Sequence, residues 1–236
     1  MKLKSNLHCH TSDDPEDDIP YSPYEAMSTA AKKGFDVLSF TCHNLVAQNP
    51  RYERFAEERG ILLIPGIEKT IEGKHVVIVN ADKDAERIET FSDLEKYKDR
   101  KKNILVLAPH PFFPSLDSLR KKFFGHASLF DAVERSWFAS KLIDFNKKAE
   151  KVAREYGLPY LATSDTHDLS FLDVSYAIIE SEKKDIESVI EAIRRGSFSN
   201  KSRPIGFLKE MFFYAVKMKL LDIFSGKPTS RRQSDA

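Results

Sequence analysis

The chain has 236 residues, which is enough for one ordinary domain or for a single α/β barrel of about 250 residues. Its 37 Lys and Arg nearly balance its 36 Asp and Glu, so no strong overall field attracts long nucleic acid or an anionic membrane. No apolar run approaches the roughly 18 residues of a membrane span, and the first residues, MKLKS, are not expected to act as a secretory signal. With only two cysteines, Cys9 and Cys42, a reduced cytoplasmic location is expected.

Short apolar segments alternate with longer helical ones along the chain. Ser22 and Pro23 open the first helix, and Gly34 ends it. Strands are predicted at residues 3–7, 37–40, 61–64, 75–79, 104–108, 131–133, 160–163 and 177–179. Further helices are expected at residues 52–58, 91–97, 116–121, 140–156 and 185–194. Seven or eight strand and helix units favour a parallel sheet that closes into a barrel with helices outside.

The last part of the chain has a different pattern. Residues 205–226 predict an amphipathic helix, because apolar side chains recur at three- and four-residue steps at Leu208, Met211, Phe212, Ala215, Met218 and Leu221. Packing on or beside the barrel is expected for this helix, and a membrane-surface or subunit contact is the alternative. Residues 227–236 lack apolar side chains and predict a disordered tail. The barrel domain is therefore expected to span residues 1–204.

Histidines and acids gather beside the ends of the predicted strands. His8 and His10 are two residues apart, so on a strand both imidazoles face the same way. The same placement of ligand-type side chains recurs later in the chain, at His43, Glu68, His110, Asp165 and His167. The carboxyl ends of barrel strands form the active-site mouth, so these side chains are expected to converge there. Imidazole and carboxylate ligands from several strands predict a site for more than one metal ion.

Five motifs in order resemble the PHP (polymerase and histidinol phosphatase) domain family. They are LHCHT at residues 7–11, VLSFTCHN at 37–44, IPGIE at 64–68, APHP at 108–111 and SDTH at 164–167. The resemblance extends from Leu7 to about Arg203. It implies a distorted seven-stranded, TIM-like α/β barrel that carries a metal-dependent phosphoesterase site.

The resemblance also implies how the ligands are shared among the metals. One metal would be held by His8, His10, Glu68 and Asp165. Glu68 would bridge to a second metal bound by His75 and His110, although His75 begins a strand and spacing alone fits a core or surface role equally well. His43 and His167 would hold a third metal. By the same resemblance, the catalytic residues are Glu68, Asp165 and His167.

The third metal requires a further ligand from the acidic segment that follows the first motif. This segment offers five candidates, Asp13, Asp14, Glu16, Asp17 and Asp18. Counting forward from His10 favours Asp14, and counting back from the first helix favours Asp18. Most of the five acids are expected to be solvated side chains of a loop.

Cys42 is a departure from the family pattern. The family usually has Thr-Asp-His-Asn where this chain has Thr41-Cys42-His43-Asn44. The missing carboxylate would orient or tune the neighbouring histidine. On a strand Cys42 points away from the face that carries His43, so a buried structural thiol is expected there, and likewise at Cys9.

Cations near the metals would capture the phosphate of a substrate. Arg135 and Lys69 lie at the expected rim, and a guanidinium can hold phosphate through two parallel hydrogen bonds. Exposed ion pairs are the alternative role for both. Glu134 and Trp137 belong to the same rim, where Trp137 would stack on a base or cap the core. His126 lies outside every motif and is not included in the site.

These features predict a metal-dependent phosphoesterase that uses two or three divalent ions. Histidine-rich ligation favours zinc, manganese or iron over magnesium or calcium. The expected substrate is a phosphomonoester, such as a nucleotide or a small metabolite, or a short oligonucleotide, and stable binding of long nucleic acid is not expected. One alternative is a non-catalytic scaffold with a decayed site, which Cys42 favours. The other is a metal-dependent amidohydrolase, in which a lysine usually takes the place of Glu68.

Overall fold

The computed structural model describes residues 1–137, 139 and 144–204. The strands are β1 (Lys2–Cys9), β2 (Val37–Phe40), β3 (Leu62–Ile71), β4 (Lys74–Val79), β5 (Leu105–Ala108), β6 (Ala132–Arg135), β7 (Tyr160–Ala162), β8 (Ser175–Glu180) and β9 (Phe198–Ser202). The α-helices are α1 (Pro23–Lys32), α2 (Pro50–Glu57), α3 (Phe91–Arg100), α4 (Lys122–His126), α5 (Lys147–Glu155) and α6 (Ile186–Arg194). Three short 3₁₀ segments are η1 (Lys83–Arg87), η2 (Ala127–Leu129) and η3 (Leu169–Phe171).

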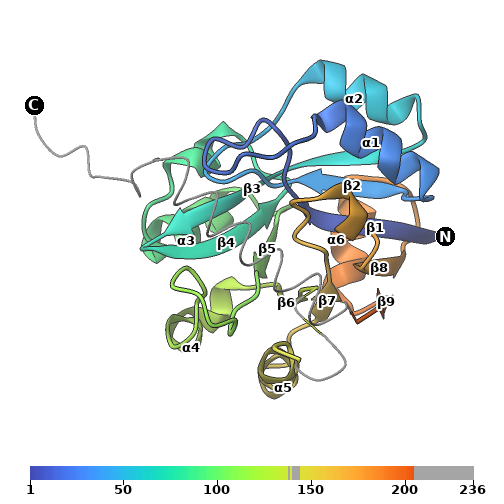
Figure 1. Cartoon of the computed structure of the whole chain (residues 1–236). Coiled ribbons are helices and arrows are strands. Elements are labelled where there is room, and N and C mark those ends of the chain that lie inside the picture. Colours follow the sequence, from blue (N-terminus) through green and yellow to red (C-terminus); the bar gives the residue numbers. More distant parts are fainter. Residues whose placement is uncertain (138, 140–143, 205–236) are drawn as a thin grey trace, which may run out of the picture.

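The strands form one mixed sheet in the order β7-β6-β5-β4-β3-β2-β1-β8-β9. Four neighbouring pairs are parallel, namely β1 with β2, β2 with β3, β5 with β6, and β6 with β7. The other four pairs are antiparallel. The expected seven-stranded parallel barrel is therefore corrected to nine strands of mixed direction, while the α/β class is confirmed (Figure 1).

The two edges of the sheet approach each other and nearly close it into a barrel. The side chain of Asn200 on β9 accepts a hydrogen bond from Ala162 N and donates one to Tyr160 O, both on β7. In the segment that follows β7, an isolated parallel bridge joins Thr166 to Cys9 on β1. These contacts bring the chain after β7 beside β1, so that residues far apart in sequence share one mouth.

Successive side chains along each strand point alternately into the barrel and towards the outer layer of helices. On β5, Leu105 and Leu107 belong to the interior core, whereas Val106 packs in the outer core beneath α3 and α5. Helix α6 also packs on the interior core, and its Arg194 donates to Ile104 O just before β5 begins. The helix therefore closes the end of the barrel at which the parallel strands start, and the opposite end carries the site.

Local sequence signals explain the helix boundaries. Helix α1 begins with a capping box in which the Ser22 hydroxyl accepts from Glu25 N and the Glu25 carboxylate accepts from Ser22 N. Helices α1 and α2 cover one side of the sheet, and α4 and α5 cover another (Figure 1). The helix predicted at residues 116–121 is instead found at Lys122–His126. No helix in the described ranges is long and apolar enough to cross a membrane.

The predicted helix at residues 205–226 and the tail at residues 227–236 lie outside the described residues. The same is true of residues 140–143, with which the predicted fifth helix begins.

Candidate metal centre

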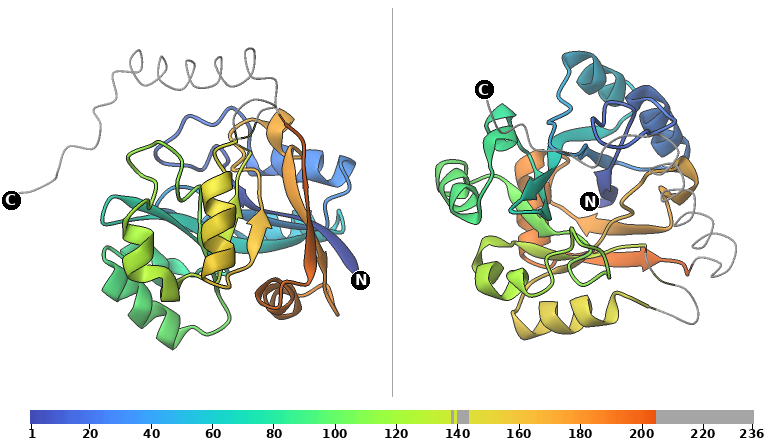
Figure 2. Two further views of the ribbon diagram at one scale, coloured as in Figure 1. Left: turned by 90° about the horizontal axis from the view of Figure 1, so that it is seen from below. Right: turned by 60° about the vertical axis from the view of Figure 1, so that its left-hand side comes forward.

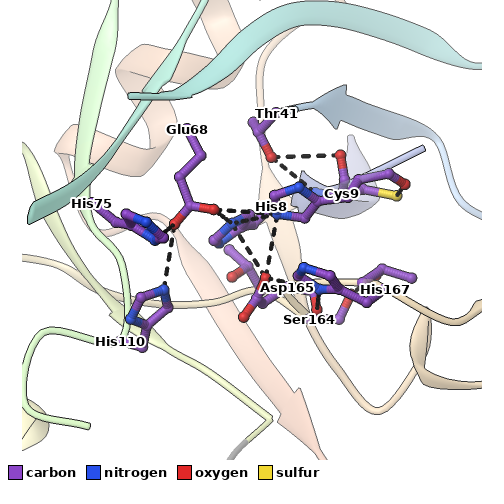
Figure 3. A network of polar contacts seen from close by, with 12 residues as sticks. His8, Cys9, Thr41, Glu68, His75, His110, Ser164, Asp165 and His167 are labelled. Carbon is purple, nitrogen blue, oxygen red and sulfur yellow. Dashed lines mark hydrogen bonds and ion pairs between the residues drawn. The ribbon is translucent and has the colours of Figure 1, made fainter. Parts of the chain in front are cut away.

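Glu68 lies at the centre of a buried cluster at the barrel mouth, and its two carboxylate oxygens face different histidines (Figure 3). Oε1 lies 3.1 Å from Nδ1 of His75 and 3.3 Å from Nε2 of His110. Oε2 lies 3.2 Å from the Nε2 atoms of His8, His10 and His43. A single carboxylate therefore joins histidines from both halves of the barrel, as the sequence predicts for a bridging ligand.

Asp165 completes this cluster from the segment after β7. Its Oδ1 lies 3.4 Å from Nε2 of His8, from Nε2 of His10 and from Nδ1 of His167. The backbone of Asp165 has a φ of 44°, and that of His110 has a φ of 28°. Non-glycine residues rarely adopt this left-handed region, and where they do the strain often marks a functional site. The chain thus holds both side chains in the mouth at a cost in backbone conformation.

Two acids of the loop between β1 and α1 approach the other histidines. Asp14 Oδ2 lies 2.7 Å from His10 Nδ1 and 3.0 Å from His43 Nδ1, and it accepts a hydrogen bond from His43 N. Asp17 Oδ2 lies 2.9 Å from His167 Nε2 and 3.8 Å from His43 Nδ1.

Asp14 is thus in the site as predicted. Asp18 is exposed and, among the described residues, forms no ion pair with a histidine of the cluster, whereas Asp17 does. Asp17, and not the predicted Asp18, is the second acid of this loop that approaches the histidines. A one-residue offset in a loop without regular structure leaves no periodic signal in the sequence.

Glu134 on β6 supports the histidines from behind. Its Oε1 lies 2.7 Å from Nδ1 of His8 and accepts a hydrogen bond from the Thr163 hydroxyl. Its Oε2 accepts a hydrogen bond of 2.6 Å from His110 N. The carboxylate is fully buried. Glu134 therefore orients one histidine ring and fixes the backbone of another, a role that the sequence analysis did not assign to it.

The predicted phosphate-binding residues point away from the mouth. Because Glu134 faces inward, the next residue of β6, Arg135, faces outward, and its Nε and Nη2 donate to Ser202 Oγ. Lys69 likewise alternates with Glu68 and shares the outer face of β3 with Ile67. Among the described residues, no hydrogen bond or ion pair joins Arg135 or Lys69 to the cluster, so phosphate binding by these two side chains stays a prediction.

The remaining residues singled out from the sequence pack in the core or against another aromatic ring, outside the metal centre. Cys42 and Cys9 are fully buried in the core beneath α1, where burial raises their thiol pKa values to about 11 and about 12. Trp137 is buried and packs against Phe171, with ring centroids 5.1 Å apart. His126 stacks on Phe91 at 4.0 Å.

The opposite charges of the cluster raise the pKa values of His8 and His110 and lower the pKa of Glu68. Burial alone disfavours a charged His8, but the carboxylates of Glu68, Asp165 and Glu134 outweigh it and hold the His8 pKa well above its usual value. The pKa of His110 is raised to about 9, because the Glu68 carboxylate outweighs the effect of burial. The pKa of Glu68 is lowered well below its usual value, since nearby histidines overcome its desolvation.

The donor set fits divalent metal ions. Three groups of side chains have ligand atoms within 4.8 Å of one another, namely His8, His10, Glu68 and Asp165; His10, Asp14 and His43; and His43, Glu68 and His75. Glu68 Oε1 and Asp165 Oδ1 are buried and accept no well-formed hydrogen bond within the described residues. Buried carboxylate oxygens of this kind require a partner, and a cation held jointly with the imidazoles would supply it.

Comparison with known proteins agrees with this geometry. The sequence model of the PHP-associated family matches residues 144–198. A two-domain protein from Bacteroides vulgatus, which contains a predicted PHP-like metal-dependent phosphoesterase, superposes with a TM-score of 0.64 and 16% identity over 86% of this chain and 65% of that one. The resemblance to the PHP family is confirmed. This PHP-like barrel also superposes on a lesion-specific endonuclease from Pyrococcus furiosus, with a TM-score of 0.61 and 17% identity over 85% of this chain and 58% of that one.

Two relatives show similarity in sequence. An uncharacterised protein of Methanocaldococcus jannaschii is 25% identical over 131 residues, which span 52% of this chain and 75% of that protein. A 5'-3' exoribonuclease of Haemophilus influenzae is 36% identical over 87 residues, which span 35% of this chain and 31% of the enzyme. The PHP-like barrel thus aligns with about a third of that nuclease and with less than two thirds of the two solved structures above.

Proposed function

We propose that this protein is a metal-dependent phosphoesterase that hydrolyses a phosphomonoester of a nucleotide or small metabolite, or a short oligonucleotide. The observation that carries the proposal is the convergence of five histidines on the two carboxylate oxygens of Glu68. The similarity to a phosphoesterase and to two nucleases supports phosphate esters as the substrate class.

In this proposal each part of the cluster has a role. His8, His10, Glu68 and Asp165 would hold one ion, Glu68 would share a second with His75 and His110, and His43 and His167 would hold a third with Asp14 or Asp17. Bound divalent cations supply charge for the phosphate oxygens and a water molecule of lowered pKa. Histidine-rich ligation favours zinc, manganese or iron.

Three residues are proposed to be catalytic, Glu68, Asp165 and His167. The carboxylates of Glu68 and Asp165 fix the histidines around the position of the reacting phosphate. The His167 imidazole lies at the accessible side of the cluster with 10% of its side chain exposed. Its Nε2 lies 2.9 Å from Asp17 Oδ2, and this pairing would orient the imidazole at that side of the cluster.

The alternatives have less support. A decayed scaffold would have lost ligands, whereas each histidine of the matched motifs lies in the cluster. An amidohydrolase of the related kind usually has a bridging lysine, but no lysine pairs with Glu68 or Asp165 among the residues described. A solved amidohydrolase from Chromobacterium violaceum shares the fold with a TM-score of 0.51 and 14% identity, over 69% of this chain and 87% of that one. We further propose that residues 1–204 form one phosphoesterase domain.

Metal reconstitution followed by a phosphatase panel tests the proposal. We expect at least two equivalents of manganese, zinc or iron per chain, and hydrolysis of nucleotide or sugar phosphates that depends on the added metal. Glu68→Gln should abolish turnover, and the exposed Glu57→Gln should not. Less than one equivalent of metal after reconstitution, or undiminished turnover by Glu68→Gln, would exclude the proposed site.

A further inference from the structure

A row of aromatic rings on the flank of the barrel begins at Phe112, two residues after His110 of the metal centre. The ring of Phe112 lies 5.9 Å from that of Phe124, which lies 6.2 Å from that of Tyr156. Phe124 is 44% exposed and Tyr156 is 46% exposed, so two of these large rings face solvent. We call Phe112, Phe124 and Tyr156 the aromatic row. It crosses from the loop before α4 to the end of α5, and these two helices lie side by side in both views of Figure 2.

The aromatic row is connected directly to the metal centre. Phe112 follows His110 by two residues, and the loop that it opens is bonded back to the cluster. Ser118 Oγ lies 3.3 Å from His110 Nδ1, and Asp117 O accepts a hydrogen bond from His75 N. A chain lying on these rings would therefore lead into the mouth beside Glu68.

Lysines flank the aromatic row. Lys148 Nζ lies 4.7 Å from the centroid of the Phe112 ring. In the described part of the chain, no carboxylate lies within 4.0 Å of the side-chain nitrogens of Lys121, Lys147 or Lys148. Within α5, Glu150 pairs with Arg154 at 3.6 Å and Glu155 pairs with Lys151 at 3.7 Å. The flank thus combines stacking surfaces with lysines that form no ion pair among the described residues.

We propose that the aromatic row and its lysines bind the bases and backbone of single-stranded nucleic acid and direct one end of it to the metal centre. This inference rests on the proposed function and narrows its substrate from any phosphate ester to an oligonucleotide. Aromatic rings accept any base because every base has a flat face, while lysines follow the phosphates. The small net charge of the whole chain is compatible with this, because the positive charge is local.

Binding and hydrolysis are measured separately to test the proposal. A labelled single strand of about twelve nucleotides, within the site sizes of such surfaces, is titrated into the full chain by fluorescence anisotropy with the metals chelated. Phe124→Ala and Tyr156→Ala should each weaken binding about tenfold, within the range for one base stacked on a ring. Lys121→Ala combined with Lys148→Ala should weaken binding and reduce its salt dependence.

The controls use matched side chains on α1, and a small substrate. Tyr24→Ala, which removes a ring that is 36% exposed, and Lys32→Ala should leave oligonucleotide binding unchanged. All of these variants should hydrolyse p-nitrophenyl phosphate as the parent does. If the parent chain with metal does not hydrolyse p-nitrophenyl phosphate, the proposed function is refuted. The binding titration still shows whether the aromatic row binds the oligonucleotide.

Two results would overturn the inference. The first is oligonucleotide binding that the row and lysine variants do not change. The second is a change of oligomeric state in Phe124→Ala and Tyr156→Ala without a change in oligonucleotide binding, which would make the flank a contact between copies of the chain.

Discussion

The carboxylate of Glu134 shows how one buried side chain organises two others. It accepts from the ring of His8 with one oxygen and from the backbone of His110 with the other. Metal-binding histidines commonly depend on such acceptors for ring orientation. Strand alternation narrows the choice to two residues, because β6 must place either Glu134 or Arg135 inside the barrel. The sequence does not show which of the two faces inward.

Glu134→Gln should weaken metal binding by about tenfold to a hundredfold, the range typical of residues that orient metal ligands. Glutamine offers one acceptor oxygen where the site uses two, and its amide group would face a donor. Metal titration of the purified variant measures the effect. The exposed Glu150→Gln on α5 is the matched control. Unchanged affinity in Glu134→Gln would show that the histidines hold their positions without it.

Cys42→Asp restores the residue that the PHP family usually has, yet we expect it to destabilise the protein. The thiol is completely buried among apolar side chains beneath α1, and its polar neighbour is the Thr11 hydroxyl at 3.6 Å. An aspartate there would be a buried charge beside Asp14, at a cost of several kcal/mol. A thermal melt and a metal titration check this, with Cys42→Asn separating size from charge. Tighter metal binding at unchanged stability would indicate instead a tuning role.

The strand β3 illustrates which elements could be predicted. The sequence placed a strand at residues 61–64 and Glu68 after its end, but β3 continues to Ile71 and turns through Glu72 and Gly73 into β4. Glu68 therefore lies within the strand and not after its end. The strand β9 was missed because FSNKS is polar and mostly exposed, and its pairing with β8 depends on backbone hydrogen bonds. The direction of a strand does not change its apolar pattern, so the sequence alone predicts a parallel sheet where β4 and β9 pair antiparallel with their neighbours.

Gly66→Ala should destabilise the barrel by about 1–3 kcal/mol through overpacking between β2 and β3. A Cβ at this position would collide with Ser39 Oγ and would lie 2.9 Å from Thr41 Cγ2. The added methyl group would displace the strand that carries Glu68, so metal affinity should also fall. Gly125→Ala is the control, because a Cβ there meets no atom within 4 Å. Denaturant unfolding that gave equal stability for both variants would contradict this packing.

The barrel as a whole gathers buried acids and bases from distant parts of the chain into one mouth. Asp14, Glu68, Glu134 and Asp165 are all buried, and so are His8, His10, His43 and His110. The closure of β7 against β1 and β9 brings Asp165 to His8, which no local pattern in the sequence could show. The motifs nevertheless indicated most of these residues, since the histidines and acids of the five motifs each follow or end an apolar run.

Metal binding to this mouth should release protons near neutral pH. The pKa of His10 is raised to about 9, since hydrogen bonds with Asp14, Asp165 and Glu68 outweigh burial and the charge of His43, and that of His110 is also about 9. Both imidazoles therefore carry protons at pH 7 in the metal-free protein, and a metal must displace them. Metal affinity should rise with pH up to about 9 and fall towards pH 6.

The same raised pKa values set the pH dependence of the metal-free fold. A histidine whose pKa is higher in the folded than in the unfolded chain stabilises the fold below its unfolded pKa, and this stabilisation is lost as pH rises towards about 9. The metal should therefore stabilise the protein more at pH 8.5 than at pH 6.5. Calorimetric titrations in buffers of different ionisation enthalpy count the released protons, and thermal melts with and without metal measure the stabilisation. Metal binding without proton release and with equal affinity at both pH values would contradict this prediction. It would show that the imidazoles are already neutral and that the neighbouring carboxylates do not keep them protonated.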